Sequence, residues 1–191
     1  MFGKINVLPI ISGHIRTLCS GESASQSRRV LKRDIAFFYI VPVAIAATLS
    51  WRSIAMPDKF VDFLIVTFTI FIPLLVNVLF SVFSIQARPD SPRSDPFGDT
   101  SRRLLADIYL NLSYSIVVAF AAVGALGLTK LIDQPRAIDM PESFWSYFNP
   151  IAVKLIWCGA YFLTIHLALT LLMIVKRTHV LLGNEYLSDK T

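Results

Sequence analysis

The amino-acid sequence predicts an all-α membrane protein with four transmembrane helices and both termini in the cytoplasm. Of its 191 residues, 54% are apolar and only 16% are charged, whereas a soluble domain carries roughly 45–50% apolar and about 25% charged residues. The apolar residues gather in four runs that are separated by polar, proline-containing stretches. The basic residues are distributed unevenly among those stretches. This composition excludes a soluble globular domain, a disordered chain and a disulfide scaffold.

The four apolar runs predict the positions of the transmembrane helices. A helix that crosses roughly 30 Å of hydrocarbon needs about 20 mainly apolar residues. We therefore expect the spans at residues 35–51, 63–85, 108–128 and 155–175. The first span is short and is expected to stand nearly upright. Pro42 and Pro73 lie inside the first two spans, where neighbouring helices can satisfy the carbonyl groups that a proline leaves free.

The polar segments on one side of the membrane are expected to contain projecting helix ends. These segments are the N-terminal segment 1–34, the loop 86–107 and the tail 176–191. Thr100 or Ser101 is a suitable N-cap for the third helix, and Gly183 is a natural end for the fourth. Together the projecting ends would form a cytoplasmic collar, whose apolar residues include Leu104 and Leu105.

Lysine and arginine are concentrated in these same segments. The N-terminal segment holds six of them, the loop after the second span four and the tail three, which leaves five of the 18 for the other side. Because short cytoplasmic loops carry an excess of Lys and Arg, we expect both termini in the cytoplasm.

The collar has two interpretations. Its basic residues could bind only anionic headgroups, at about 1 kcal/mol per Lys or Arg. Alternatively, its basic and apolar residues together dock a cytoplasmic partner protein, which would also explain the leucine pairs. The candidate docking residues are Arg28, Arg29, Arg102, Arg103, Lys176, Arg177, Leu181 and Leu182.

A cluster of aromatic residues lies in the outer loop between the third and fourth spans. It comprises Phe144, Trp145, Tyr147 and Phe148. Such a cluster normally lies flat in the headgroup region as part of an aromatic belt. The alternative is a surface that responds to the outer leaflet or contacts a molecule there.

Two polar residues fall near the middle of a span, Asn77 in the second and His166 in the fourth. Ionisable residues at such positions are functional candidates by default. His166 could form an interhelical hydrogen bond to Asn77 or to a hydroxyl, worth roughly 0.6–2 kcal/mol, or it could line a pore, proton path or gate. A proton-coupled pump is not expected, because no second charged residue completes a relay.

Small residues in the third span favour association of helices. Ala121 and Ala125 have a small-x-x-x-small spacing, which lets two helix backbones approach closely. A four-span protein with little mass outside the bilayer has surplus packing surface, so we expect a homo-oligomer.

Catalytic and metal-binding motifs are absent from the sequence. It contains no H-E-x-x-H, G-x-S-x-G or Walker A pattern, and its histidines do not pair with cysteines at metal-ligand spacing. We therefore expect no enzymatic activity, no cofactor and no metal.

The layout of the whole chain resembles the KwaA family, the small four-span membrane subunit of the bacterial Kiwa anti-phage defence system. The similar features are the basic stretch SRRVLKRD before the first span, the cytoplasmic loop RPDSPRSDPFGD and the short tail. The resemblance implies a homo-oligomeric sensor in the bacterial inner membrane that holds a cytoplasmic, DNA-binding partner, with no direct nucleic acid binding by this chain. The competing interpretation is a small homo-oligomeric channel or membrane-perturbing effector, with Asn77 and His166 facing a pore.

Overall fold

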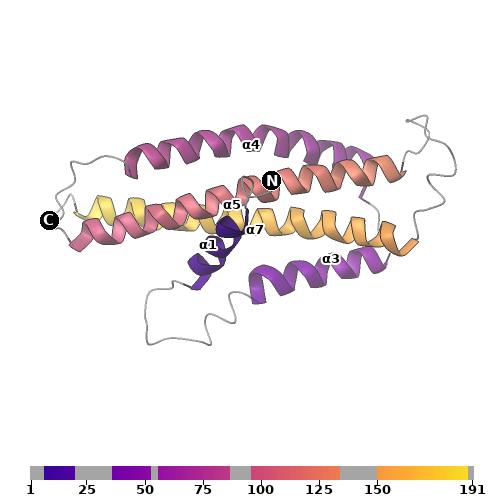
Figure 1. The fold of residues 1–191 in the computed structure, drawn as a ribbon, viewed down its shortest axis with the longest axis horizontal. Coiled ribbons are helices and arrows are strands. Elements are labelled where there is room, and N and C mark those ends of the chain that lie inside the picture. Colours follow the sequence, from indigo (N-terminus) through magenta and orange to yellow (C-terminus); the bar gives the residue numbers. More distant parts are fainter. Residues whose placement is uncertain (1–6, 20–35, 53–55, 87–95, 134–149, 189–191) are drawn as a thin grey trace, which may run out of the picture. The chain divides into compact units, whose positions relative to one another are not determined.

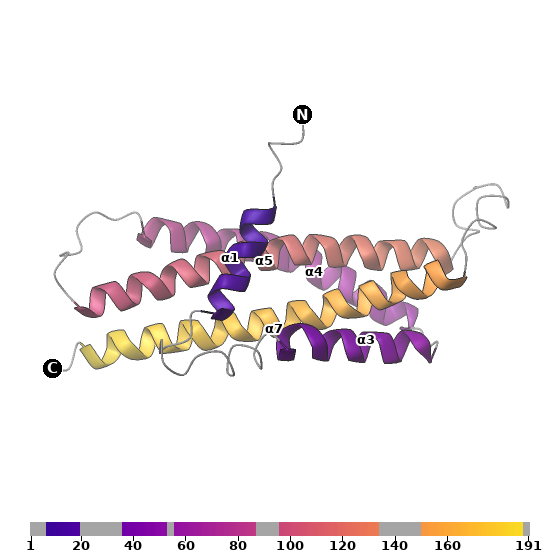
Figure 2. The same ribbon diagram turned by 60° about the horizontal axis from the view of Figure 1, so that its bottom comes forward.

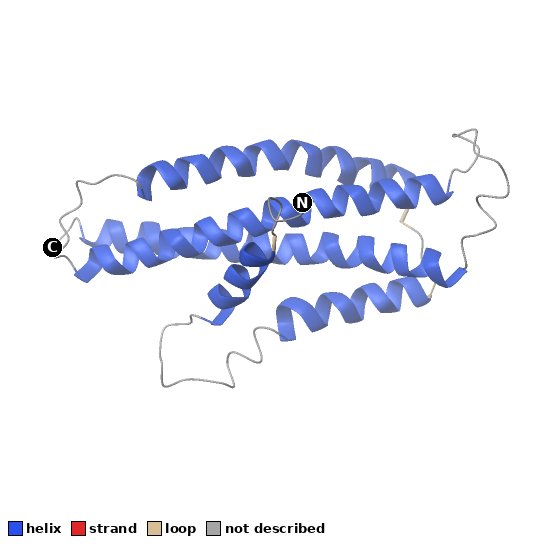
Figure 3. Cartoon of the chain, viewed as in Figure 1, coloured by secondary structure: helices blue, strands red, loops and turns tan. Residues whose placement is uncertain are grey.

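The computed structural model describes residues 7–19, 36–52, 56–86, 96–133 and 150–188, and all its regular elements are helices (Figures 1 and 3). In chain order they are α1 (Leu8–Cys19), the π-helix η2 (Ala36–Ile40), α3 (Val41–Trp51), α4 (Asp58–Gln86), α5 (Pro96–Asp133) and α7 (Pro150–Ser188). The described residues contain no strand. The expected all-α class is therefore confirmed for this part of the chain.

Three helices are long and apolar enough to cross a membrane. These segments are Asp58–Ser84, Arg102–Ile132 and Ile151–Val180, which contain the second, third and fourth expected spans. The first expected span corresponds to the shorter apolar helix Ala36–Trp51. At 1.5 Å per residue this helix is roughly 24 Å long, less than the hydrocarbon thickness of about 30 Å. A fourth span and the direction of crossing stay predictions.

Both expected helix ends on the basic side are wrong. Helix α5 begins at Pro96 rather than at Thr100 or Ser101, consistent with the preference of proline for the first turn, where its missing N–H is not needed. Helix α7 continues through Gly183 to Ser188. A glycine inside a helix costs only about 1 kcal/mol relative to alanine, so Gly183 alone does not end it.

The chain divides into two units, each of which we describe by itself. The first unit consists of Met1–Asp34, Leu74–Ile116 and Leu169–Thr191, and the second of Ile35–Pro73 and Val117–Ala168. Helices α4, α5 and α7 each contribute to both units, whereas α1 belongs to the first and α3 to the second.

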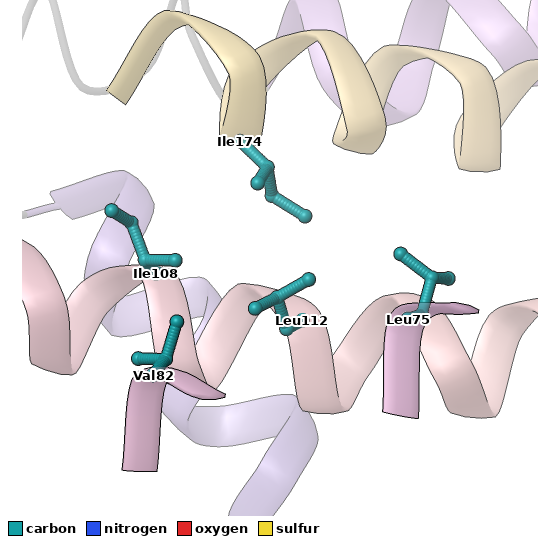
Figure 4. Close-up of a cluster of buried hydrophobic side chains, with 5 residues drawn as sticks. All are labelled: Leu75, Val82, Ile108, Leu112 and Ile174. Atoms are coloured by element: carbon teal, nitrogen blue, oxygen red, sulfur yellow. The ribbon is translucent and has the colours of Figure 1, made fainter. Parts of the chain in front are cut away.

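The core of the first unit is a cluster of apolar side chains from three helices (Figure 4). The buried members are Leu75, Val82, Ile108, Leu112 and Ile174. Leu104 and Leu105 pack against this cluster and are half-buried. They were expected to be exposed on the collar, and this expectation is wrong because they fill space inside the unit.

The core of the second unit contains a stripe of small residues on α5. Ala119 and Ala122 have no exposed surface, and Leu126 continues the stripe one turn further. Their spacing of three and four residues places them on one helix face. Ala121 is exposed and Ala125 is half-buried. The predicted small-x-x-x-small pair therefore does not form the packed face within the chain.

We expect Leu112→Ala to destabilise the protein by roughly 2–5 kcal/mol, because it leaves a cavity in the first unit's core. Thermal unfolding in detergent micelles measures this loss. The matched control is Leu172→Ala, since Leu172 is 64% exposed on α7 and its truncation opens no cavity. Equal effects of the two substitutions would contradict the packing described for Leu112.

Candidate functional site

Helix α1 is an element that the sequence patterns did not predict, because residues 1–34 were treated only as a basic segment. The helix buries polar side chains against the rest of the first unit: His14 is 0% and Thr17 is 2% exposed. Two sequence signals could have located it. Pro9 lies in the first helical turn, which proline favours, and Ile11 and Ile15 have helical spacing.

His14 and Thr17 both contact Asn111 of α5, which is fully buried. The Nδ1 atom of His14 lies 2.7 Å from Oδ1 of Asn111, and the hydroxyl of Thr17 lies 2.9 Å from the same oxygen and 2.7 Å from the carbonyl oxygen of His14. An amide oxygen only accepts hydrogen bonds. The hydrogen in the bond between His14 and Asn111 must therefore be on Nδ1 of the His14 ring. The His14 ring also stacks on Tyr114, with ring centroids 3.9 Å apart. Asn111 is thus the buried polar anchor of α1.

Arg177 of α7 caps the C-terminal end of α1. Its Nη2 atom donates to the carbonyl oxygen of Thr17 at 2.6 Å. This carbonyl belongs to the last turn of α1, where backbone oxygens have no helical donor. The Nη1 atom lies 3.0 Å from Oδ2 of Asp107, so a carboxylate balances the charge. Arg177 was a candidate for partner docking, but its guanidinium is occupied inside the first unit.

In the second unit, His166 of α7 hydrogen-bonds to a backbone oxygen of the first apolar helix. Its Nδ1 atom lies 3.0 Å from the carbonyl oxygen of Phe38. Phe38 lies in the π-helix η2, one turn before Pro42. His166 therefore ties α7 to this π-helix through a backbone oxygen. The imidazole ring also contacts Tyr39 and stacks on Phe162.

This contact changes the expectation for both intramembrane polar residues. His166 has no exposed surface, and its Nδ1 atom bonds to the carbonyl of Phe38 rather than to the side chain of Asn77. Asn77 lies on α4 in the first unit, with an exposed side chain. The expected partner of His166 was Asn77 or a hydroxyl, whereas its Nδ1 atom bonds to a backbone oxygen.

The remaining candidate docking residues fall into two groups. Arg102, Arg103 and Lys176 are exposed, on α5 and α7 of the first unit. The others lie where the structure describes no side chain, and they are Arg28, Arg29, Leu181 and Leu182. The aromatic cluster of the outer loop, Phe144, Trp145, Tyr147 and Phe148, also lies outside the described residues.

At the opposite end of the helices, charged residues contact one another or an aromatic ring. Lys130 of α5 lies 3.3 Å from Asp58 and 3.0 Å from Asp62 of α4. The Nζ atom of Lys154 lies 5.7 Å from the centroid of the Trp51 ring. Exposed contacts of this kind stabilise only weakly.

Comparisons with known proteins do not add a family. No protein-family model, curated protein or solved structure matches the chain. Among the described residues, no group of three or more His, Cys, Asp or Glu side chains is arranged to hold a metal ion. The class defined by the fold is therefore an all-helical protein with three helices long and apolar enough to span a membrane.

We expect Asn111→Leu to release α1, because it removes the oxygen that binds His14 and Thr17 without a large change in volume. Two such hydrogen bonds contribute roughly 1 kcal/mol together, so tryptic cleavage after Arg16 should become about fivefold faster. Mass spectrometry of the fragment that ends at Arg16 measures the rate. Asn77→Leu, the same change at an exposed position, is the control and should leave the rate unchanged; no difference between the two variants would argue against the anchor.

We expect His166→Leu to destabilise the chain by roughly 1 kcal/mol, because it removes the hydrogen bond to the carbonyl oxygen of Phe38. Unfolding in detergent micelles measures the loss, and Asn77→Leu, at an exposed position, is the control. Equal stabilities of the two variants would contradict the role described for His166.

Proposed function

We propose that this chain is a non-enzymatic sensor and scaffold subunit of a bacterial anti-phage defence complex in the inner membrane. It would form a homo-oligomer and dock a cytoplasmic partner protein on its basic side. The observation that carries the proposal is the one-sided charge of the chain, together with the exposed Arg102, Arg103 and Lys176 at the basic ends of two membrane-length helices. The proposed defence role, and a DNA-binding partner, depend on the resemblance to the KwaA family.

The net charge of each side supports a docking surface on the basic side more strongly than the number of Lys and Arg residues alone. In the four-span topology the expected cytoplasmic segments carry thirteen basic and eight acidic residues, and the opposite side carries five of each. The whole net charge of +5 therefore belongs to one side. Such a surface attracts an acidic partner and accelerates its association.

The packing of the first unit limits which residues could bind a partner. Leu104 and Leu105 belong to the internal cluster, and Arg177 caps α1, so neither the leucine pair nor this arginine is available to a partner. The proposed docking surface consists of Arg102, Arg103 and Lys176. Binding to it should be mainly electrostatic and should weaken as salt concentration rises.

Homo-oligomerisation is supported by a part of α5 that meets no other side chain of its own unit. A Cβ atom placed on Gly124 has no neighbour within 4 Å, and Ala121 and Phe120 are exposed one turn away. Small residues on such a face allow a second helix to approach closely. A second copy of the chain is the proposed neighbour.

Burial of His166 favours a scaffold over a channel. A residue that lines a pore between protomers must present its polar atoms on the outside of its own chain. His166 has no exposed surface and donates to the backbone of η2 instead. The channel interpretation would then lose the ionisable side chain that it places in the pore and keep Asn77.

The proposal predicts that the double substitution Arg102→Glu and Arg103→Glu abolishes co-purification of a cytoplasmic partner protein, because it reverses two charges of the docking surface. Affinity purification from detergent-solubilised membranes at low salt measures the loss, with membrane insertion checked by fractionation. We expect at least a tenfold decrease in recovered partner, which corresponds to about 1.4 kcal/mol or more.

Lys59→Glu is the matched control for this experiment. Lys59 is exposed at the start of α4, on the side expected to lie outside the cytoplasm, so its charge reversal should not change recovery. Full recovery of the partner with the double substitution, or equal loss with the control, would count against docking at these residues.

A further inference from the structure

Helix α1 has three faces of different character. An α-helix turns by about 100° per residue, which places Gly13, His14 and Thr17 on one face, and this face packs against α5. The remaining circumference is divided between an apolar and a polar flank. The apolar flank holds Leu8, Ile11 and Ile15, and the polar flank holds Ser12 and Arg16.

The apolar flank is left uncovered by the described chain. Leu8 is 71% and Ile15 is 40% exposed, and Ile11 is half-buried. The polar flank is also exposed, at both Ser12 and Arg16. The two flanks are centred about 100° apart around the helix axis. A helix in uniform surroundings, whether water or hydrocarbon, would gain nothing from this division.

The depth at which α1 packs along α5 explains why its exposed surface has an apolar and a polar flank. The charged residues at the basic end of α5 stop at Asp107 and resume only at Lys130. Asn111 and Tyr114, which hold His14, lie four and seven residues past Asp107, roughly 6 and 10 Å along the helix. Interfacial helices bury their apolar face about 5–10 Å into the boundary between headgroups and acyl chains. Helix α1 therefore packs at the depth of that boundary.

The direction of α1 agrees with this position. Figure 2 shows α1 running across α5 and α7 in the first unit rather than alongside them. Since α5 and α7 contain the membrane-length segments, a helix that crosses them lies along the membrane surface.

We infer that α1 is an in-plane membrane helix whose apolar flank contacts the acyl chains of one leaflet and whose polar flank faces its anionic headgroups. Leu8, Ile11 and Ile15 bind lipid, and the guanidinium of Arg16 matches the headgroup phosphates in charge. Asn111 and Arg177 fix the rotation of the helix, because they hold its packed face, which contains His14 and Thr17, against α5 and α7. The inference concerns lipid contact and does not depend on the proposed docking of a partner.

The test uses nitroxide labels on the full-length chain in vesicles of phosphatidylethanolamine and phosphatidylglycerol. Single cysteines replace Leu8, Ser12, Ile15 or Arg16 in a Cys19→Ser, Cys158→Ser background. Collision rates with oxygen, which concentrates in hydrocarbon, and with a water-soluble nickel chelate report the surroundings of each label. We expect labels at positions 8 and 15 to favour oxygen severalfold over the chelate and labels at positions 12 and 16 to show the reverse preference.

Two reference labels calibrate the measurement. A label at Val66, which is 58% exposed within the apolar part of α4, represents lipid, and one at Lys176 represents the basic end. All substituted side chains of α1 are exposed, so the labels do not disturb the buried cluster. Chelate collisions at positions 8 and 15 as frequent as at Lys176 would overturn the inference, and so would an oxygen preference at all four positions.

Discussion

A backbone carbonyl in apolar surroundings must receive a hydrogen bond, and this constraint determines how the two N-terminal helices are held. Water cannot satisfy such groups in the hydrocarbon, where each free group costs several kcal/mol. The carbonyl of Phe38 lies in the π-helix η2 and is bound by His166. The carbonyl of Thr17 lies in the last turn of α1 and is bound by Arg177. Both donors come from α7, which thereby fixes η2 in the second unit and α1 in the first.

The same contacts determine which basic side chains of α7 are exposed and could bind a partner protein. Arg177 was grouped with Lys176 by sequence, yet the two side chains have different roles, because adjacent residues on a helix point about 100° apart. Arg177 is paired with Asp107 and the end of α1, and Lys176 is exposed. Among the residues whose side chains the structure describes, the proposed docking surface therefore consists of charged side chains alone. A surface of this kind distinguishes partners by charge and association rate more than by buried area.

Sequence patterns predicted the parts of the fold that depend on local composition. Hydropathy located the apolar parts of three membrane-length helices and of the shorter apolar helix, though not the ends of α5 and α7, because the cost of burying polar groups in lipid acts on each segment separately. Helix α1 was not predicted, because its packing depends on contacts between residues that are distant in the sequence. Its buried face is polar, and its partner Asn111 is 97 positions from His14 and 94 from Thr17. The role of His166 was equally hidden, since its partner is a backbone oxygen that no side-chain pattern reveals.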